Sequence, residues 1–546
     1  MKIKELKTYW YLIALIVIVS TLALFGGVME PDSALYASIA KNMVLRNDYI
    51  NLYVRGVDWL DKPHLTFWIA AASFKVFGIS GFAYKLPSFL SGLLGAYYLY
   101  LLAKSIYDQK IGLMSTLIFL TSLHILVSTF DVRAEVYITT FTLAGIYHYH
   151  KAHHGSLWHI VAGSFFAACA IMIKGIFVLI PLFAGFIIYW MLTKQWKQLL
   201  KLKWWLAIVL IFVFILPELY TLYVQFDLHP EKIVFGKTGV SGLKFFFWDS
   251  QFGRFFNTGP IQGKGDKLFF LHTTLWAFLP WSVLFYTAVF NLFKKKNRVG
   301  LPNESIMIWT SAAVTFLLFS LSKFQLPHYI LIILPQFAII TALYIRKIEG
   351  KILRIFIRVQ DFIYILVVML LSALALVFDL ESKYIIIGIL WILFGAAYLI
   401  FKGKTIETIM IRATLLSSGL MIFLSLFFYP ALLKYESGKK AGQWLADHYP
   451  KEKAQVLVYA DAYSFDFYAP GEPHYFWNYE DLRSVSKRKN FILYTPESEL
   501  EKLKKDYHAE VLKSFDYFHT TKLTGTFLNA KTRSITLEHF YLVKLH

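Results

Sequence analysis

The sequence predicts an α-helical polytopic membrane protein with a small α/β domain at its C-terminal end. Hydrophobic residues make up 57% of the 546 residues, 16% are charged, and the mean hydropathy is +0.53. Soluble domains contain about 45–50% apolar and about 25% charged residues. Apolar stretches of about 17–25 residues, the length that a helix needs to cross a bilayer, recur between residues 9 and 430.

Thirteen of these stretches are predicted to be transmembrane helices. Their approximate bounds are 9–28, 83–103, 112–128, 134–150, 157–173, 175–192, 204–225, 268–292, 305–321, 327–345, 359–378, 384–401 and 408–430. A helix can cross lipid because it satisfies its own backbone hydrogen bonds. Since the number of crossings is odd, we expect the two ends of the chain on opposite sides of the membrane.

Lysine and arginine concentrate in alternate connections between these spans, which predicts an orientation. Segments 194–203, 294–298 and 346–358 are rich in cations, whereas the intervening turns hold about one each, such as Arg133, Lys174 and Lys323. We therefore expect a cytoplasmic N-terminus, a first span that stays as an anchor, and a periplasmic C-terminal part, in a bacterial inner membrane. The net charge of +20 follows from this topology, and we expect no nucleic-acid partner.

The composition changes after Pro430, where the chain becomes charged and aromatic. Segments 455–459, 491–494 and 534–544 are predicted strands, and segments 440–448 and 497–507 are predicted helices. The predicted domains are a transmembrane domain over 1–430, with periplasmic loops 29–82 and 226–267, and a periplasmic α/β domain over 431–546. Segments 32–46 and 64–77 of the first loop are predicted interfacial helices, because Leu35, Ile39 and Met43 recur every four residues.

The first loop also carries the candidate reactive groups. Asp32 follows a proline and opens a predicted helix, so it either caps free backbone N–H groups or serves as a base at the membrane boundary, a role that Glu30 could share. Lys62 lies between Asp61 and Pro63, in a stiff turn, and is either an exposed loop lysine or a contact for a lipid phosphate.

Further charged residues are predicted on the same side of the membrane. Charges near membrane depth are costly, so they either serve a function or reach back to the interface. These residues are Asp131, Arg133, Glu135, Lys174, Arg254 and Lys323.

Other kinds of site have less support. Five histidines between His148 and His159 lie in a predicted inside connection, which favours a hydrated loop over a metal site. The sequence contains no GxxxxGK[ST], GxGxxG, HExxH or GxSxG motif, so nucleotide-driven transport and the common hydrolase mechanisms are not indicated. The single cysteine, Cys169, excludes an intrachain disulfide.

Several segments in order resemble the family 39/83 membrane glycosyltransferases, which include protein O-mannosyltransferases and the bacterial lipid A aminoarabinose transferase. The resemblance covers residues 10–345. The segments are Pro31-Asp32-x-x-x-Tyr36-Ala37, Trp59-Leu60-Asp61-Lys62-Pro63, Lys174-Gly175, Phe252-Gly253-Arg254-Phe255, Leu279-Pro280-Trp281, and Lys323-Phe324-Gln325-Leu326-Pro327-His328-Tyr329 with Leu334-Pro335.

This resemblance implies a GT-C fold and an inverting transfer from a polyprenyl-phosphate-linked sugar to a lipid or protein acceptor on the outer face. It assigns catalytic roles to Asp32, the candidate base, to Lys62 at the donor phosphate, and to Asp131 as the acid that holds Lys62. The donor phosphate and lipid would also contact Arg133, Lys174, Arg254, Lys323 and Tyr329. Supporting roles near the acceptor fall to Glu30, Tyr36, Asp61 and Glu135.

The sequence departs from the family pattern at three places. Ser33 replaces an acid, Leu35 replaces an arginine, and Gly263-Lys264-Gly265 stands where a histidine is common. In the aminoarabinose transferase that histidine is associated with a metal, so we expect no required cofactor and leave a divalent metal open. Two alternatives to an enzyme remain: a flippase or transporter of lipid-linked sugars, and a non-catalytic assembly protein. The concentration of charges in an outer loop favours the enzyme.

Overall fold

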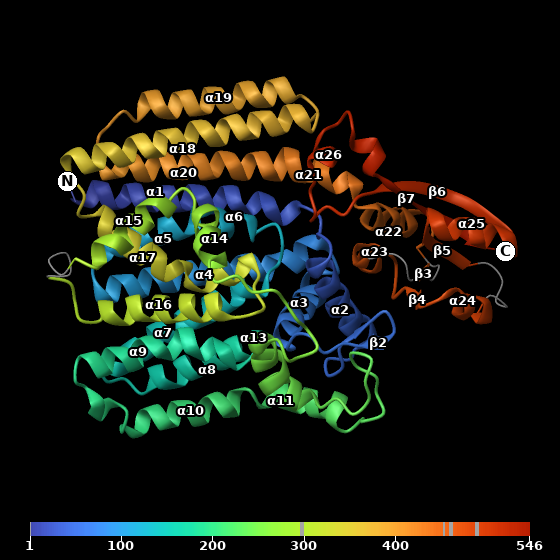
Figure 1. Cartoon of the computed structure of the whole chain (residues 1–546), viewed down its shortest axis with the longest axis horizontal. Coiled ribbons are helices and arrows are strands. Elements are labelled where there is room, and N and C mark those ends of the chain that lie inside the picture. Colours follow the sequence, from blue (N-terminus) through green and yellow to red (C-terminus); the bar gives the residue numbers. More distant parts are fainter. Residues whose placement is uncertain (1, 295–299, 451–453, 458–461, 486–490, 546) are drawn as a thin grey trace.

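The computed structural model describes residues 2–294, 300–450, 454–457, 462–485 and 491–545. A bundle of roughly parallel and antiparallel helices forms most of the molecule, and the C-terminal part projects from one end of it (Figure 1). Helix α1 begins at the opposite end of the bundle. The prediction of a helical polytopic protein with a small C-terminal α/β part is confirmed.

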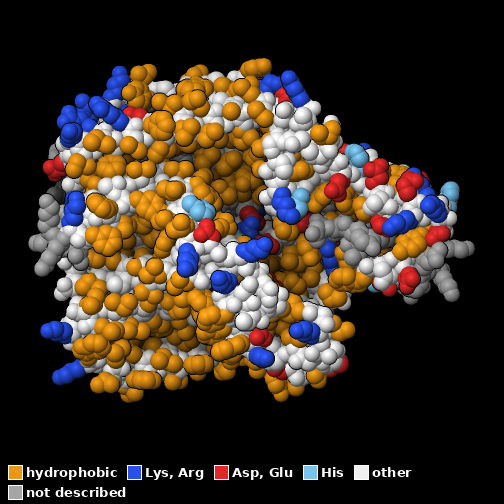
Figure 2. Space-filling model, viewed as in Figure 1, with side chains coloured by type: hydrophobic (Ala, Val, Ile, Leu, Met, Phe, Trp, Pro, Cys, Tyr) orange, Lys and Arg blue, Asp and Glu red, His pale blue; other side chains and the backbone are white. Residues whose placement is uncertain are grey.

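Each predicted span falls on helical segments. The helices of the bundle are α1 (Lys2–Ser20), α4 (Gly81–Ile106), α5 (Gln109–Leu120), α6 (Leu123–Val127), α7 (Ala134–His153), α8 (Trp158–Lys174), α9 (Leu179–Leu192), α10 (Leu202–Phe214), α11 (Leu216–Leu222), α14 (Phe269–Ala277), α15 (Ser282–Leu292), α16 (Ser305–Leu321), α17 (Leu334–Ile345), α18 (Gly350–Val377), α19 (Lys383–Ile400), α20 (Ile406–Phe423) and α21 (Tyr429–Leu432). Among the described residues, seven helices are long and apolar enough to cross a membrane by length and composition, and six further apolar helices are 10–17 residues long. Figure 2 shows hydrophobic side chains over the flank of the bundle.

Short 3-10 and π-helical segments extend or join these helices. They are η1 (Thr21–Phe25), η2 (Ile176–Val178), η3 (Trp196–Gln198), η4 (Tyr223–Asp227), η5 (Phe245–Gly253), η7 (Pro327–Ile333), η8 (Leu424–Phe428) and η9 (Leu433–Tyr435), with the short helices α12 (Gly242–Lys244) and α13 (Arg254–Phe256) beside η5. The end of η4 and the segments α12, η5 and α13 lie in the second long loop.

The interruptions in two of the predicted spans face each other. The span 112–128 divides into α5 and α6, and the span 268–292 divides into α14 and α15 near Pro280. The Leu123 N–H donates to the Leu279 carbonyl (2.9 Å), and the Trp281 indole donates to Thr121 Oγ1 (2.9 Å). Backbone groups that lose their helical hydrogen bonds inside an apolar bundle need other hydrogen-bond partners. Here the two interruptions are joined by hydrogen bonds to each other.

The first long loop forms α2 (Asp32–Arg46), a short hairpin of β1 (Tyr53–Val54) and β2 (Val57–Asp58), and α3 (Leu65–Phe77). Helix α2 does not present the polar side that its sequence predicts to solvent. Lys41 and Asn42, expected at the exposed face, are 3% and 6% exposed. The reason is tertiary, because α2 packs between α3 and helix α23 (Tyr463–Tyr468) of the C-terminal part.

The C-terminal part is a mixed five-stranded sheet flanked by helices. The strand order is β4 (His474–Phe476), β3 (Ala454–Leu457), β5 (Phe491–Pro496), β7 (Glu538–Leu545) and β6 (Ala509–Tyr517); β3 pairs in parallel with both of its neighbours, and β7 is antiparallel to both of its own. The other elements are α22 (Ser437–His448), α24 (Tyr479–Val485), α25 (Glu497–Asp506), α26 (Gly525–Leu528) and η10 (Arg533–Thr536). The strand predicted over 534–544 begins at Glu538, and residues 458–459 of the first predicted strand lie outside the described residues.

Candidate active site

A mostly apolar cavity lies at the end of the bundle that carries the C-terminal part, and cations line its polar end. The space between its lining residues, with the open solvent at its mouth included, is about 980 Å³. Its apolar wall is formed by residues of η2, η5, α16 and the chain near them, among them Phe177, Phe245, Phe246, Leu318 and Phe319. Its polar residues include Asp61, Lys62, Lys174, Ser250, Gln251 and Arg254. A cavity of this kind suits a ligand with an anionic head and an apolar tail.

Asp61 holds two of these cations together. Its carboxylate forms ion pairs with Lys62 and with Arg254. Burial opposes ionisation of Asp61, but the charges of Lys62 and Arg254 hold the pKa of its carboxyl well below its usual range. Burial, together with the neighbouring cations Arg254 and Lys174, lowers the pKa of Lys62. The Arg254 Nε is buried and has no hydrogen-bond partner among the described residues, so this end of the cavity retains donors for an anion.

Lys174 enters the cavity from the end of α8. Its Nζ lies 2.8 Å from Glu135 Oε1 and 4.4 Å from the centroid of the Tyr329 ring. The next residue, Gly175, has φ +102°, and a Cβ there would lie 2.2 Å from Gln251 Nε2. Gln251 Nε2 donates to the Lys174 carbonyl (2.9 Å). Glycine is therefore required after this lysine both by the backbone conformation and by the close approach of η5.

A second charged cluster lies at the start of α7. Arg133 Nη1 lies 2.8 Å from Asp32 Oδ2, and the guanidinium also pairs with Asp131. The Asp32 side chain is 45% exposed, compared with 16% for Asp131. Burial raises the pKa of Asp131, although Arg133 opposes this effect. Asp32 is therefore the acid of this cluster that a second substrate can reach.

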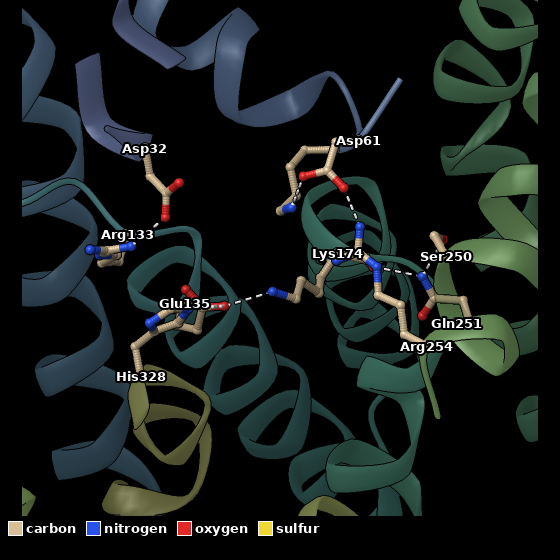
Figure 3. A network of polar contacts seen from close by, with 10 residues as sticks. Asp32, Asp61, Arg133, Glu135, Lys174, Ser250, Gln251, Arg254 and His328 are labelled. Carbon is tan, nitrogen blue, oxygen red and sulfur yellow. Dashed lines mark hydrogen bonds and ion pairs between the residues drawn. The ribbon is translucent and has the colours of Figure 1, made fainter. Parts of the chain in front are cut away.

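Figure 3 shows how the two clusters are joined. Asp32 and Arg133 lie on one side and Asp61 and Arg254 on the other, while Glu135 and Lys174 point toward each other between them. His328 of η7 approaches Glu135 from a third direction, with Nε2 at 3.8 Å from Oε1. Burial raises the pKa of Tyr36, and the charges of Asp61 and Asp32 raise it further. Asp32 and Asp61 of the first loop therefore lie in one charged network with Arg133, Glu135 and Lys174.

Three predicted site residues take other places. Glu30 is buried against the C-terminal part, where its Oε1 accepts the Ser464 N–H (2.5 Å). The Lys323 side chain is exposed, and its backbone N–H donates to the Phe255 carbonyl (3.1 Å). Asp131 pairs with Arg133 rather than with Lys62, because Asp61 is the residue adjacent to that lysine.

Other residues of the site were not among those predicted from the sequence. Gln251 and Glu218 line the cavity from η5 and α11, two segments that are otherwise rich in apolar and aromatic residues. Phe177 packs edge-to-face against Phe252, with the ring centroids 5.1 Å apart. In the sequence it does not differ from the other apolar residues of its predicted span. The one available signal was the cost of a buried carboxylate at Glu218, which predicts a specific partner.

The residues present do not fit a divalent metal. Among the described residues, no group of three or more His, Cys, Asp and Glu side chains is placed to hold one. The acids at the cavity already pair with cations, Asp61 with Lys62 and Arg254, and Glu135 with Lys174. No step of the chemistry below is therefore assigned to a metal.

Comparison with known proteins gives matches in both sequence and fold. A family model described as dolichyl-phosphate-mannose-protein mannosyltransferase matches residues 61–220. An uncharacterized protein of Aquifex aeolicus (strain VF5) is 29% identical over 328 residues, which cover 58% of this chain and 60% of that protein. The undecaprenyl phosphate-alpha-4-amino-4-deoxy-L-arabinose arabinosyl transferase 2 of Proteus mirabilis (strain HI4320) is 24% identical over 397 residues, which cover 67% of this chain and 66% of that protein.

The crystal structure of ArnT from Cupriavidus metallidurans bound to undecaprenyl phosphate superposes with a TM-score of 0.75 and 16% sequence identity, over 98% of this chain and 97% of that chain. The chain therefore has the GT-C fold of a multi-pass membrane protein. Within that class, the chain is similar to the arabinosyl transferases and to the mannosyltransferase family model, and the resemblance stated from the sequence is confirmed.

Proposed function

We propose that the protein is a glycosyltransferase that moves a sugar from a polyprenyl-phosphate-linked donor to an acceptor on the outer face of an inner membrane. The observation that carries the proposal is the arrangement of Lys62, Lys174 and Arg254 at one end of the apolar cavity. The cations suit the phosphate, and the apolar walls suit the isoprenoid chain. The names of the matched relatives, which include undecaprenyl-phosphate-dependent arabinosyl transferases, support the same donor class.

The chemistry follows from the placement of the charges. An acceptor oxygen attacks the anomeric carbon from the face opposite the phosphate, the bond from that carbon to the phosphate oxygen breaks, and the bonding electrons leave with the phosphate. Because negative charge develops on the leaving phosphate, Lys62, Lys174 and Arg254 would stabilise the transition state more than the ground state. If the acceptor is a hydroxyl group, its proton passes to the Asp32 carboxylate.

The acceptor would approach from the more open side, where Asp32 is exposed. Figure 2 shows a hollow lined by hydrophobic side chains in the face of the bundle beside the C-terminal part, with acidic and basic side chains at its edge. This shape suits an amphipathic acceptor. Lipid A, another envelope glycan and a protein hydroxyl are the proposed acceptor classes.

A flippase or transporter of lipid-linked sugars is the alternative from a different class. Such a protein needs charges reachable from both sides of the membrane, whereas the charged groups described above gather at one end of the bundle. The enzyme therefore accounts better for this arrangement.

The test is a transfer assay with the purified full-length protein in lipid nanodiscs. Radiolabelled polyprenyl-phosphate sugars are incubated with membrane acceptors, and the unsubstituted protein is compared with Lys62→Ala. We expect transfer by the former and a loss of about 10²–10³-fold in the latter, because a fixed donor at the developing charge is removed. Lys244→Ala, at an exposed residue of the second long loop, is the control. Equal transfer by Lys62→Ala and unsubstituted protein would overturn the site assignment.

A further inference from the structure

A buried carboxylate on α11, Glu218, contacts His64 at the end of the turn that carries Lys62. Glu218 Oε2 accepts the backbone N–H of His64 (2.9 Å), and its Oε1 lies 3.0 Å from His64 Nδ1. The other ring nitrogen, Nε2, lies 2.8 Å from the Ile50 carbonyl oxygen. Both the Glu218 and the His64 side chains are 0% exposed. His64 therefore fastens the turn to α11 at one end and to the start of the hairpin at the other.

A second side chain of the same helical segment holds the hairpin. Gln225 of η4 accepts the Leu52 N–H (3.0 Å) through Oε1, and its Nε2 donates to the Leu52 carbonyl (3.0 Å) and to Asp58 Oδ1 (2.9 Å). Gln225 is also fully buried. Two polar side chains seven positions apart thus fix the loop that follows α2, and the α11–η4 segment acts as a rigid base for it.

The carboxylate of Glu218 has no role in the chemistry proposed above. Glu218 lines the same cavity as Lys62, but both of its oxygens face His64. A buried carboxylate without partners is costly, so the pairing explains how the acid is tolerated and leaves its function to be assigned.

We propose that Glu218 is a positioning residue that, through His64, fixes the Lys62 ammonium at the polar end of the cavity. The inference rests on the proposed function, because the position of Lys62 matters only if it contacts the donor phosphate. Lysine has a long flexible side chain, so the accuracy with which its ammonium is placed depends on the backbone of the turn. Pro63 stiffens that backbone, and Glu218 anchors the residue that follows.

The test measures binding of undecaprenyl phosphate to the full-length protein in lipid nanodiscs. Glu218→Ala removes both contacts to His64, and we expect the dissociation constant to rise about tenfold or more. Glu218→Gln can keep both contacts. The glutamine Oε1 accepts the backbone N–H of His64, and the glutamine amide group donates to Nδ1 of the neutral His64 ring. We expect this variant to bind within about threefold of the unsubstituted protein. Similar weakening by the Ala and the Gln variants would overturn the proposal.

Gln360→Ala is the matched control. Gln360 is also buried, and its Nε2 donates to a carbonyl of a neighbouring helix, Ile409 O (3.0 Å), away from the cavity. We expect this variant to bind undecaprenyl phosphate normally. Hydrogen exchange gives a second readout: residues 48–64 should exchange faster in Glu218→Ala and at the original rate in Gln360→Ala. If Glu218→Ala does not fold, Glu218→Asp, whose shorter side chain cannot reach both groups of His64, replaces it with the same expected effects.

Lys62→Ala distinguishes a failure of the positioning role of Glu218 from a failure of the proposed donor site. If Lys62→Ala weakens binding but Glu218→Ala and Glu218→Asp leave both binding and exchange unchanged, the positioning role is wrong and the donor site stands. If Lys62→Ala binds undecaprenyl phosphate as tightly as the unsubstituted protein, the donor site itself is wrong.

Discussion

Asp32 is the most accessible acid of the charged network, and its carboxylate faces Arg133 rather than a lysine of the cavity. In the proposed reaction it takes the proton of a hydroxyl acceptor. Asp32→Asn should lower the rate of transfer to a hydroxyl acceptor by about 10²–10⁴-fold, the usual contribution of a general base, without weakening binding of undecaprenyl phosphate. The measurement is the transfer assay beside a binding assay, with Asp266→Asn in the second long loop as the control. Full transfer by Asp32→Asn would remove Asp32 from the catalytic role.

Individual residues also differ in how well the sequence predicts their role. Asp32 and Lys62 stand out because each is charged, adjacent to a proline and placed between long apolar stretches. Lys174 and Arg254 stand out as cations near the ends of predicted spans. Glu218 and Gln251 do not, because their role depends on partners that are distant in the chain, His64 and the Lys174 carbonyl.

At the scale of elements, helix α2 depends on the C-terminal part. The Lys41 ammonium donates to the carbonyl oxygens of Asp466 (2.8 Å), Phe467 (3.0 Å) and Ala469 (2.6 Å), at the end of α23. Arg55 of the following hairpin pairs with Asp466 (2.8 Å) and lies 3.8 Å from the Tyr463 ring centroid. Burial lowers the pKa of Lys41 to about 8, and these acceptors compensate for the buried charge.

Lys41→Met should therefore destabilise the protein. Methionine matches the length of lysine but leaves three carbonyl groups without a donor, at a cost of about 1–3 kcal/mol for each group that finds no water. We expect a lower Tm in nanodiscs and faster hydrogen exchange over 32–46 and 463–468. Lys434→Met is the control, since Lys434 is exposed and pairs with the exposed Glu381. An unchanged Tm for Lys41→Met would show that α2 does not need this contact.

At the scale of the whole molecule, Glu436 joins the C-terminal part to the start of the first loop. Its Oε1 accepts the Glu30 N–H (3.1 Å) and the Thr520 hydroxyl (3.0 Å). Burial raises the pKa of Glu436 from 4.5 to about 7, and burial also raises the pKa of Glu30. The folded state thus favours the protonated form of Glu436. The contribution of this protonation to the stability of the folded state is complete below pH 4.5 and is lost as the pH rises through about 7.

The Glu436→Gln variant, which resembles the protonated acid, should lose less stability across this window than the unsubstituted protein. The measurement is Tm in nanodiscs at several pH values between 4.5 and about 7. Glu472→Gln, at the exposed ion pair with Arg46, serves as the control for a carboxylate outside the buried contact. A steeper fall of Tm with pH in Glu436→Gln than in the unsubstituted protein would contradict the prediction.

The sequence by itself determined the helical membrane class, and it singled out the acid and the lysine of the first loop as candidates. Hydropathy and charge act locally along the chain, because lipid requires each span to be apolar and to satisfy its own backbone. The tertiary structure decided the breaks that face each other near Thr121 and Pro280, the burial of α2 and the anchoring of the Lys62 turn by Glu218. These features depend on contacts between residues far apart in the chain, which hydropathy and local periodicity do not specify.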